Sequence, residues 1–507
     1  MVCTELIEAI LASTGSTWVK EPELIRNAKR YRISADKINT AVEKGIIVKL
    51  ICDGIPYYTL PKYALWEMSV ADNALRIQNN YHLPQNITIS VINELIADGE
   101  AYYGRGKLAE EQREAVICAV LNGLAIITGG PGTGKTFTLQ IMSYVLYRLN
   151  YKVDIRFTAP TGKASRRITE STGRAAKTTQ KELGITFTNK NMKMFGGNVL
   201  IIDEVSMLDL ETAYYVFRAI ISGQKLILVG DINQLPSVGP GAVLRDLLES
   251  GAIPFVRLIH TFRQAEGSNL LNNIELIKNG EWRMQKGTDF DIIQADEDPD
   301  NQIQQLITLF KRETTTYGTE NVACLLPYRK AGVLCSDYMN NILQEEINPV
   351  GNKKYMLSHT EKGLNIKFTV GDPVMQLQNR AECANGDVGF VKDFDRNQII
   401  VTYSDGTTVN YSNNNIQELA LAYSMSINKS QGSEYKSVVM AITSAHKAML
   451  KRNLVYTGIT RAKQNCVLLQ EEAAMIKAIS CEEEYERTTF LTERLQYLKR
   501  CEKYHIG

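Results

Sequence analysis

Short apolar runs without polar alternation are the feature that most limits how this chain can fold. In the first half they are bounded by Gly, Asp or Thr and occur at Leu124–Ile127, Val199–Ile202 and Leu226–Val229. Strands that are apolar on both faces are typical of a parallel sheet that helices cover on both sides. Similar runs recur between about 320 and 475, at Val322–Leu326, Val438–Ile442 and Cys466–Leu469. The sequence therefore predicts an α/β protein with two parallel-sheet domains.

Length and composition limit the class of protein further. The chain has 507 residues, which at roughly 150 residues per domain suits three or four domains. Its 57 basic and 56 acidic residues leave a net charge of +1, so binding to nucleic acid by bulk charge is excluded, although a local basic track is not. The nine cysteines form no C-x-x-C pair, which argues against a zinc ribbon. No apolar run approaches the ~18 residues of a membrane span, so we expect a cytoplasmic protein without a membrane partner.

The first 100 residues have a different pattern, with helices and one hairpin. A helical period over 35–44 ends at Gly45, and two short strands then flank Asp53-Gly54, which is a strong turn signal. This order predicts a mainly helical, winged-helix-like domain over 1–100. A packing module with no role in DNA binding is the alternative.

The second half contains three further features. A hairpin around Asp405-Gly406 predicts a small antiparallel barrel over 366–418, inserted into the second α/β domain. The acidic segment 289–300 suggests a solvated surface. Leucines at 491, 495 and 498 have helical spacing and predict a C-terminal docking helix within 481–507.

A phosphate-binding loop is the clearest functional motif. Residues 129–136, Gly-Gly-Pro-Gly-Thr-Gly-Lys-Thr, fit G-x-x-x-x-G-K-[ST] between an apolar strand and a helical run. Glycines let backbone N–H groups approach phosphates, and the start of a helix favours negative charge. Lys135 would reach the β- and γ-phosphates of ATP, and the Thr136 hydroxyl would bind Mg²⁺.

Two later strands end in polar groups that suit the same site. The strand at 199–202 is followed by Asp203, which would hold Mg²⁺, and Glu204, which would orient or deprotonate the attacking water. The next strand leads to Gln234, which could touch the γ-phosphate. A plain strand-end turn is the alternative for Gln234, and a capping acidic pair is the alternative for the two carboxylates.

A basic segment follows the phosphate loop. Eight cations lie between 152 and 181, at Lys152, Arg156, Lys163, Arg166, Arg167, Arg174, Lys177 and Lys181. Such side chains can hold nucleic-acid phosphates without reading a base sequence. A solvated helix face is the alternative.

Eight motifs, in order, resemble those of the RecD-like branch of superfamily 1 DNA helicases. They are Glu111-Gln112, the phosphate loop, Thr158–Ser165, Asp203–Ser206, Gly230–Gln234, Thr261–Gln264, Ser430–Glu434 and Tyr456–Lys463. The resemblance runs from about residue 100 to 470. It implies RecA-like motor domains at 101–265 and at 266–365 with 419–480, and an SH3-like identity for the inserted barrel.

The resemblance also implies the residues of an ATP site. The catalytic groups would be Lys135, Glu204, Gln234, Arg263 and Arg461, the two arginines meeting the γ-phosphate. The nucleotide would be held by Gln112, which reads adenine, by Gly432 and Glu434, and by Gly129, Gly130, Pro131, Gly132, Thr133, Gly134, Lys135, Thr136 and Phe137. An arginine supplied by a second domain is worth ~10³–10⁵ in rate and makes hydrolysis depend on domain closure.

The DNA contacts are likewise implied by the resemblance. They would be Pro160, Thr161, Lys163, Thr178, Thr179, Asn379, Asn385, Ser424, Asn428 and Lys429. Asn428 and Gln180 stand where the family usually has His, and both side chains still donate and accept hydrogen bonds. A hairpin at about 183–198 would be the pin that splits the duplex, with Phe187 or Phe195 at its tip, or else a packed edge hairpin.

The implied activity is ATP-driven 5′→3′ translocation on single-stranded DNA with duplex unwinding, and ATP hydrolysis in the cleft between the two motor domains. ATP and Mg²⁺ are the expected cofactors, and single strands and single/double-strand junctions the expected partners of a monomer in DNA repair or recombination. Two alternatives stay open. One is the same motor acting on RNA or displacing proteins, and the other is a non-motor P-loop switch or scaffold that binds DNA.

Overall fold

The computed structural model describes residues 3–185, 191–262, 267–359, 365–380, 382–481 and 487–504. These residues divide into two compact units. The first contains the residues before 161, residues 168–262 and the C-terminal segment, and the second contains 161–167 and 267–481.

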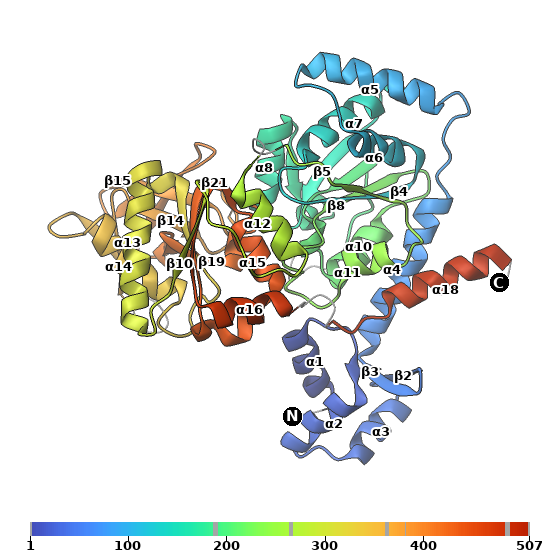
Figure 1. Ribbon diagram of the computed structural model, residues 1–507. Coiled ribbons are helices and arrows are strands. Elements are labelled where there is room, and N and C mark those ends of the chain that lie inside the picture. The colour runs from blue at the N-terminus through green and yellow to red at the C-terminus, as the bar shows by residue number, and fades with distance from the viewer. Residues whose placement is uncertain are drawn as a thin grey trace. The chain divides into compact units, whose positions relative to one another are not determined.

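A six-stranded parallel sheet forms the centre of the first unit (Figure 1). Its order is β6-β5-β7-β8-β4-β9. The strands are β4 (Leu124–Gly129), β5 (Ile155–Ala159), β6 (Ala176–Thr178), β7 (Val199–Ile202), β8 (Lys225–Gly230) and β9 (Phe255–Leu258). Every residue of β4, β7 and β8 is buried, as the predicted two-sided apolar runs require. The helices of this region are α6 (Glu110–Leu121), α7 (Lys135–Leu149), α8 (Gly162–Thr172), α9 (Thr179–Glu182), α10 (Leu210–Ala219) and α11 (Val243–Glu249).

The N-terminal part of the first unit combines helices with a small antiparallel sheet of order β1-β3-β2. Its elements are α1 (Cys3–Thr14), β1 (Val19–Lys20), α2 (Glu21–Arg30), α3 (Ala35–Glu43), β2 (Val48–Cys52) and β3 (Ile55–Thr59). Asp53 and Gly54 both have positive φ, of 50° and 77°, which is the backbone of the predicted two-residue turn. The long helix α4 (Pro61–Asn79) packs against α10 and against the C-terminal helix α18 (Leu491–Tyr504), while α5 (Ile89–Tyr103) packs against α7. Leu491 and Leu495 are buried in this docking contact.

The second unit contains a five-stranded parallel sheet of order β10-β21-β20-β11-β19. The strands are β10 (Phe290–Gln294), β11 (Val322–Leu326), β19 (Ser424–Ser426), β20 (Tyr435–Ile442) and β21 (Ala462–Gln470). The helices are α12 (Asn269–Lys278), α13 (Pro299–Tyr317), α14 (Ser336–Ile347), α15 (Arg452–Ile459) and α16 (Glu472–Ser480). With two parallel sheets on one chain, the predicted α/β class is confirmed.

An antiparallel sheet of order β17-β16-β15-β14-β18 lies within the second unit. Its strands are β14 (Pro373–Gln376), β15 (Val388–Asp395), β16 (Gln398–Tyr403), β17 (Thr408–Ser412) and β18 (Leu419–Leu421). Val374, Val391, Val401 and Tyr411 are buried in its core. A separate hairpin precedes it, formed by β12 (Tyr355–His359) and β13 (Asn365–Thr369).

The prediction of a solvated surface over 289–300 is wrong for the strand in its first half, although residues 296–300 are exposed. Strand β10 occupies this segment, and it pairs in parallel with β21 so that Phe290 lies opposite Cys466. Phe290 is fully buried. The strand is difficult to recognise in the sequence because it is short and contains an acidic residue. It lies at the edge of the sheet, where Asp291 pairs with Arg312 instead of facing an apolar layer.

Candidate functional site

The phosphate loop joins β4 to α7 and is closed around its own lysine. The Lys135 ammonium donates to the carbonyls of Gly129 and Gly130, at 2.6 and 2.8 Å. Gly132 and Gly134 have φ of 76° and 72°, which only glycine adopts readily. Because α7 begins at Lys135, its first N–H groups have no partner within the helix and are available to an anion. This cradle fits a phosphate group.

Helix α6 supports the loop from behind. Gln112, which is 1% exposed, accepts from the N–H of Ala109 and donates to the carbonyl of Thr133, both at 2.9 Å. A Cβ at position 134 would lie 2.3 Å from the Gln112 amide nitrogen, so the close approach requires glycine there. Gln112 thus contacts the phosphate loop directly, and its predicted role in reading adenine stays a prediction.

The segment after β9 also contacts the loop, which the sequence alone did not reveal. The N–H of Phe262 donates to the Gly132 carbonyl at 2.8 Å, and the N–H of His260 donates to the Glu111 carboxylate at 2.7 Å. Thr261–Gln264 was a recognisable motif, but only its arginine had a predicted role. Arg263 itself lies outside the described residues.

The two carboxylates lie at the end of β7. The N–H of Glu204 donates to the Asp203 carboxylate at 2.8 Å, and the N–H of Asp203 donates to the Thr158 carbonyl at 2.9 Å. Glu204 has φ of 55° and ψ of 40°, a left-handed conformation that is uncommon outside glycine. Backbone strain of this kind is stored where the surrounding structure fixes it, often at functional sites.

Sheet order places these groups near one another within the first unit. Strand β8 lies between β7 and β4, and all three are parallel, so their carboxyl ends meet at one edge. At roughly 4.8 Å per strand, Asp203 and the start of the phosphate loop are separated by about 10 Å of sheet. Gln234 follows β8, between them, and is 4% exposed. The oxygen atoms of Asp203 and Thr136 are the type of ligand that Mg²⁺ prefers, so the residues present fit this ion.

Arg461 lies in the second unit, directly after α15, and is 3% exposed. Its guanidinium donates to the carbonyls of Thr457 and Ser433, at 3.0 and 3.2 Å, and to the Thr460 hydroxyl at 3.3 Å. Nearby in sequence, Gly432 has φ of 73° and lies against Ala164. Glu434 forms ion pairs with Arg167 at 2.6 Å and Lys463 at 3.1 Å.

Three predicted DNA-binding residues form one hydrogen-bonded series in the second unit. The Lys429 ammonium donates to the Asn385 side-chain oxygen at 2.8 Å, and the Asn385 N–H donates to the Asn379 side-chain oxygen at 2.9 Å. Burial and the nearby charge of Arg329 lower the pKa of Lys429. In the same unit Arg166 pairs with Asp387 at 2.7 Å. We name Asn379, Asn385 and Lys429 the amide–lysine cluster.

The remaining predicted contacts differ in their exposure. Thr179 and Ser424 are buried, at 0% and 2% exposure, so their side chains do not face solvent. Thr161 and Thr178 each accept a backbone N–H near a helix start, from Ala164 and Lys181. Pro160, Lys163 and Asn428 are partly exposed.

The basic segment is less available than its charge count suggests. Arg156 pairs with Asp154 and Glu182, and Lys177 also pairs with Glu182. With Arg166 and Arg167, four of the eight cations therefore have carboxylate partners. The predicted phosphate track is partly neutralised by the protein's own acids.

The structure does not support Phe195 as an exposed pin tip. Phe195 is 3% exposed in the core of the first unit, and the Gln224 amide donates to its carbonyl at 2.9 Å. An apolar ring followed by Gly196-Gly197 suits a turn into the core as well as a hairpin tip, and the spacing does not distinguish them. Phe187, the other predicted tip, lies outside the described residues.

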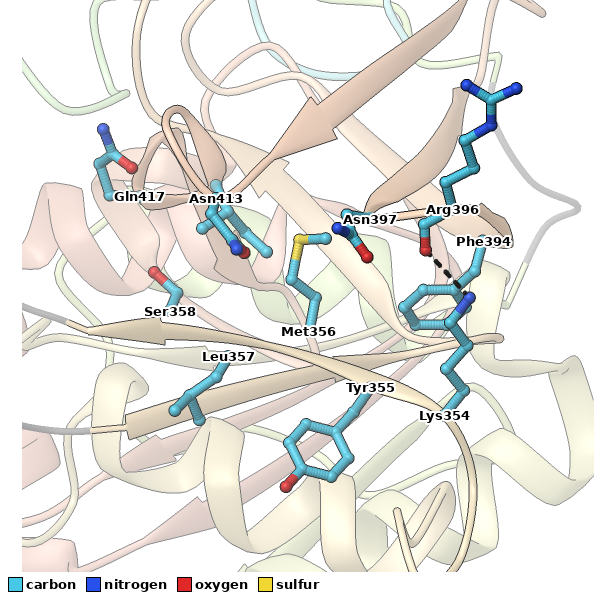
Figure 2. Close-up of a pocket in the computed structure, with 11 residues that line it drawn as sticks. Lys354, Tyr355, Met356, Leu357, Ser358, Phe394, Arg396, Asn397, Asn413 and Gln417 are labelled. Atoms are coloured by element: carbon cyan, nitrogen blue, oxygen red, sulfur yellow. Dashed lines mark hydrogen bonds between the residues drawn. The ribbon is translucent and has the colours of Figure 1, made fainter.

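A cavity of about 790 Å³ lies elsewhere in the second unit, beside the β12–β13 hairpin. Figure 2 shows Met356 of β12 directed into it, with Tyr355 and Leu357 on the opposite side of the strand, as strand alternation requires. Turn residues Asn397 and Asn413 line the other side. The predicted site residues do not line this cavity.

A parallel sheet with a phosphate loop after one strand and two carboxylates after a neighbouring strand defines the class: a P-loop protein built to bind a nucleoside triphosphate. Residues 107–298 match the family model described as an AAA domain, and residues 421–469 match that of the UvrD-like helicase C-terminal domain. The chain is homologous to the RecD-like superfamily 1 helicases.

Two curated relatives illustrate this homology. The ATP-dependent RecD2 DNA helicase of Deinococcus radiodurans is 32% identical over 400 residues, which cover 77% of this chain and 53% of the relative. The RecBCD enzyme subunit RecD of Mycolicibacterium smegmatis is 28% identical over 484 residues, covering 86% and 82%. The chain thus spans about half the length of the RecD2 relative.

Among solved structures, a Pif1 helicase unwinding forked double-stranded DNA has a TM-score of 0.45 and 19% identity, covering 79% of this chain and 98% of that chain. Within the described residues, no helix combines the length and apolarity needed to cross a bilayer.

Proposed function

We propose that this protein is an ATP-dependent DNA helicase that moves 5′→3′ along single-stranded DNA and opens duplex ahead of it. One observation carries the proposal: the ends of β4, β7 and β8 bring a phosphate cradle, two carboxylates and Gln234 to one sheet edge. The similarity to a RecD2 DNA helicase supports DNA as the substrate, and the 5′→3′ direction is inferred from the resemblance of the motifs to RecD-like helicases.

In this proposal the residues divide the work of phosphoryl transfer. Lys135 leaves its two loop carbonyls and binds the β- and γ-phosphates, and Glu204 orients the attacking water. Asp203 and Thr136 would hold Mg²⁺, which neutralises phosphate charge when bound. Gln234 contacts the γ-phosphate or the water. Arg461 approaches the γ-phosphate from the second unit when the two units close around ATP, and Arg263 meets the same phosphate.

The second unit would also bind the single strand. The amide–lysine cluster offers one cation and two carboxamides, which can hold phosphates and sugars without reading a base sequence. Single strands and single/double-strand junctions are the proposed substrates of a monomer. Binding should weaken steeply with salt and show little base preference.

The test measures ATP hydrolysis with and without oligo-dT, and unwinding of duplexes with a 5′ or a 3′ tail. Strong stimulation by oligo-dT together with opening of the 5′-tailed duplex alone is the expected result. Opening of the 3′-tailed duplex alone would refute the direction. Stimulation by oligo-U and not by oligo-dT would favour an RNA motor, and unstimulated hydrolysis without unwinding would favour a switch or scaffold. Lys135→Ala serves as the inactive control.

A further inference from the structure

The loop that contains Gln234 is hydrogen-bonded to residues outside β8 and α11, the strand and helix that it connects. It runs over residues 231–241, from the end of β8 toward α11. Within its second half the Ser237 hydroxyl donates to the Gly239 carbonyl at 2.9 Å and, more weakly, to the Gly241 carbonyl at 3.4 Å. The position of Gln234 therefore depends on what holds the carbonyls of this half.

The guanidinium of Arg487 holds three of these carbonyls, while the Pro240 carbonyl accepts from the N–H of Leu210 at 3.0 Å. The guanidinium donates to the carbonyls of Ser237 and Gly241, both at 2.8 Å, and more weakly to the Ser237 hydroxyl and the Gly239 carbonyl, at 3.2 and 3.3 Å. Arg487 is 7% exposed. Hydrogen bonds from a charged, buried donor are stronger than those between neutral groups, and a planar guanidinium fixes several acceptors at once.

Arg487 is itself anchored, together with the three residues that follow it. We name Arg487–Phe490 the C-terminal strap. The Arg487 carbonyl accepts from Arg245 at 3.3 Å, and the Thr488 carbonyl accepts from the N–H groups of Thr17 and Trp18 at 3.0 and 3.2 Å. The N–H of Phe490 donates to the buried Glu67 at 3.1 Å. The strap is thus bonded to the N-terminal part of the first unit, to α4 and to α11.

In the N-terminal part of the first unit, the Arg487 guanidinium packs directly against Gly15. Gly15 has φ of +70°, and a Cβ there would lie 2.5 Å from the Arg487 guanidinium carbon. The Gly15 carbonyl also accepts from the N–H of Gly241 at 2.8 Å. The Gln234 loop is therefore held between Gly15 on one chain segment and Arg487 on another.

We propose that Arg487 is a positioning residue for ATP hydrolysis: it fixes the loop 231–241 and through it Gln234. The proposal rests on the proposed function, because Gln234 acts only if ATP is bound beside it. Arg487 touches no reacting atom in this scheme. Its loss should leave nucleotide binding at the phosphate loop intact and slow the chemical step, since misplacement of a reacting group by about 1 Å can cost about a hundred-fold in rate.

The first test compares Arg487→Ala with Lys499→Ala, in full-length protein. Lys499 lies on α18, the helix that follows the C-terminal strap, and it bonds to the Gly251 carbonyl, away from the loop. We expect Arg487→Ala to lower kcat of DNA-stimulated hydrolysis about ten- to a hundred-fold while KM for ATP changes about two-fold or less. Arg487→Lys should be intermediate, because an ammonium cannot reach all four acceptors. Lys499→Ala should match the wild type.

The second test measures the loop directly by hydrogen–deuterium exchange of the amides in 231–241. Faster exchange in Arg487→Ala than in Lys499→Ala is expected. If Arg487→Ala does not fold, Arg487→Lys provides the test, since it keeps a buried cation but loses the planar guanidinium that reaches several acceptors. Unchanged exchange, or an unchanged kcat in a folded variant, would overturn the proposal. A wild type that hydrolyses no ATP would instead refute the proposed function, and the exchange result would still decide whether Arg487 holds the loop.

Discussion

The candidate groups of the two units differ in what holds them before any ligand binds. In the first unit they lie on strained or glycine-dependent backbone: Gly132, Gly134 and Glu204 all have positive φ. In the second unit Gly432 also has positive φ, but the charged groups are already engaged within the unit, as Arg461 is by three oxygen acceptors and Glu434 by two cations. The first unit therefore presents a backbone cradle from which Lys135 must leave two loop carbonyls, whereas in the second unit both Arg461 and Glu434 must break internal bonds before they can reach a ligand.

The largest effect is expected from a substitution in the phosphate loop of the first unit. Lys135→Ala removes the cation that the loop already holds in place, so ATP hydrolysis should fall by about 10³-fold or more, and nucleotide affinity should fall with it. Steady-state hydrolysis with oligo-dT and binding of a fluorescent ATP analogue measure both. Lys29→Ala, an exposed lysine on α2, is the matched control. Retained hydrolysis in Lys135→Ala would show that the cradle is not the nucleotide site.

The next largest effect is expected from a substitution in the second unit, where Arg461 is already hydrogen-bonded within the protein. Arg461→Ala should slow turnover by about 10³-fold while sparing nucleotide affinity, because the arginine acts only on the developing phosphate charge. It should also lower the melting temperature, since the Ser433 and Thr457 carbonyls lose a buried donor, at a cost of about 1–3 kcal/mol each. Lys135→Ala should cost less, because of its two carbonyl partners only Gly129 is buried and Gly130 is partly exposed.

Two observations would contradict this division. One is a loss of nucleotide affinity in Arg461→Ala as large as in Lys135→Ala. The other is an unchanged melting temperature, which would mean that the buried arginine contributes nothing to the fold. Arg461→Lys separates the two roles, because it keeps a charge and a donor but not the planar geometry.

A smaller effect concerns the amide–lysine cluster. Lys429→Ala should weaken oligo-dT binding several-fold at low salt and reduce the slope of log affinity against log salt by about one phosphate contact. Lys477→Ala, on α16 in the same unit, is the control. Fluorescence anisotropy at several salt concentrations measures both. Weaker binding with an unchanged slope would mean that Lys429 supports the Asn385 loop and does not contact phosphate.

The sequence predicts best what one local rule determines. The two-sided apolar strands, the phosphate loop and the Asp53-Gly54 turn each follow from a pattern of a few residues, and the structure contains all three. The missed features depend on partners distant in sequence. Strand β10 is stabilised by pairing with a strand about 170 residues later, since Phe290 faces Cys466. The hydrogen bond from Arg487 to Ser237 joins residues 250 apart, and no local sequence pattern predicts a contact over that distance.

The same limit applies to burial. Phe195 and Ser424 have the residue types expected of a pin tip and a DNA contact, but tertiary packing buries both. Gln112 stands at a motif position, and its two hydrogen bonds to Ala109 and Thr133 become visible only when the loop and α6 are placed together. Residue type and spacing locate a site, whereas the partners that hold its side chains come from the fold.

The smallest effect is expected from a buried carboxyl group of the first unit. Asp246 of α11 accepts hydrogen bonds from the side chains of Arg245 and Thr489. Burial raises the pKa of Asp246 from 3.8 to about 7, with the Arg245 charge acting against this. Between pH 4 and 7 the folded state therefore binds more protons than the unfolded state, so this group's contribution to the free energy of unfolding falls as pH rises through that window.

Asp246→Asn tests this sign, because an amide does not titrate. We expect the melting temperature of the wild type, relative to that of the variant, to fall as pH rises from 5 to 8, because the wild type loses this contribution and the amide does not titrate. Asp98→Asn, whose carboxylate is 56% exposed, should show no such trend. A difference that stays constant from pH 5 to 8 would mean that the Arg245 charge outweighs burial and holds Asp246 ionised over this range. The first unit would then resemble the second, with an engaged ion pair behind its backbone cradle.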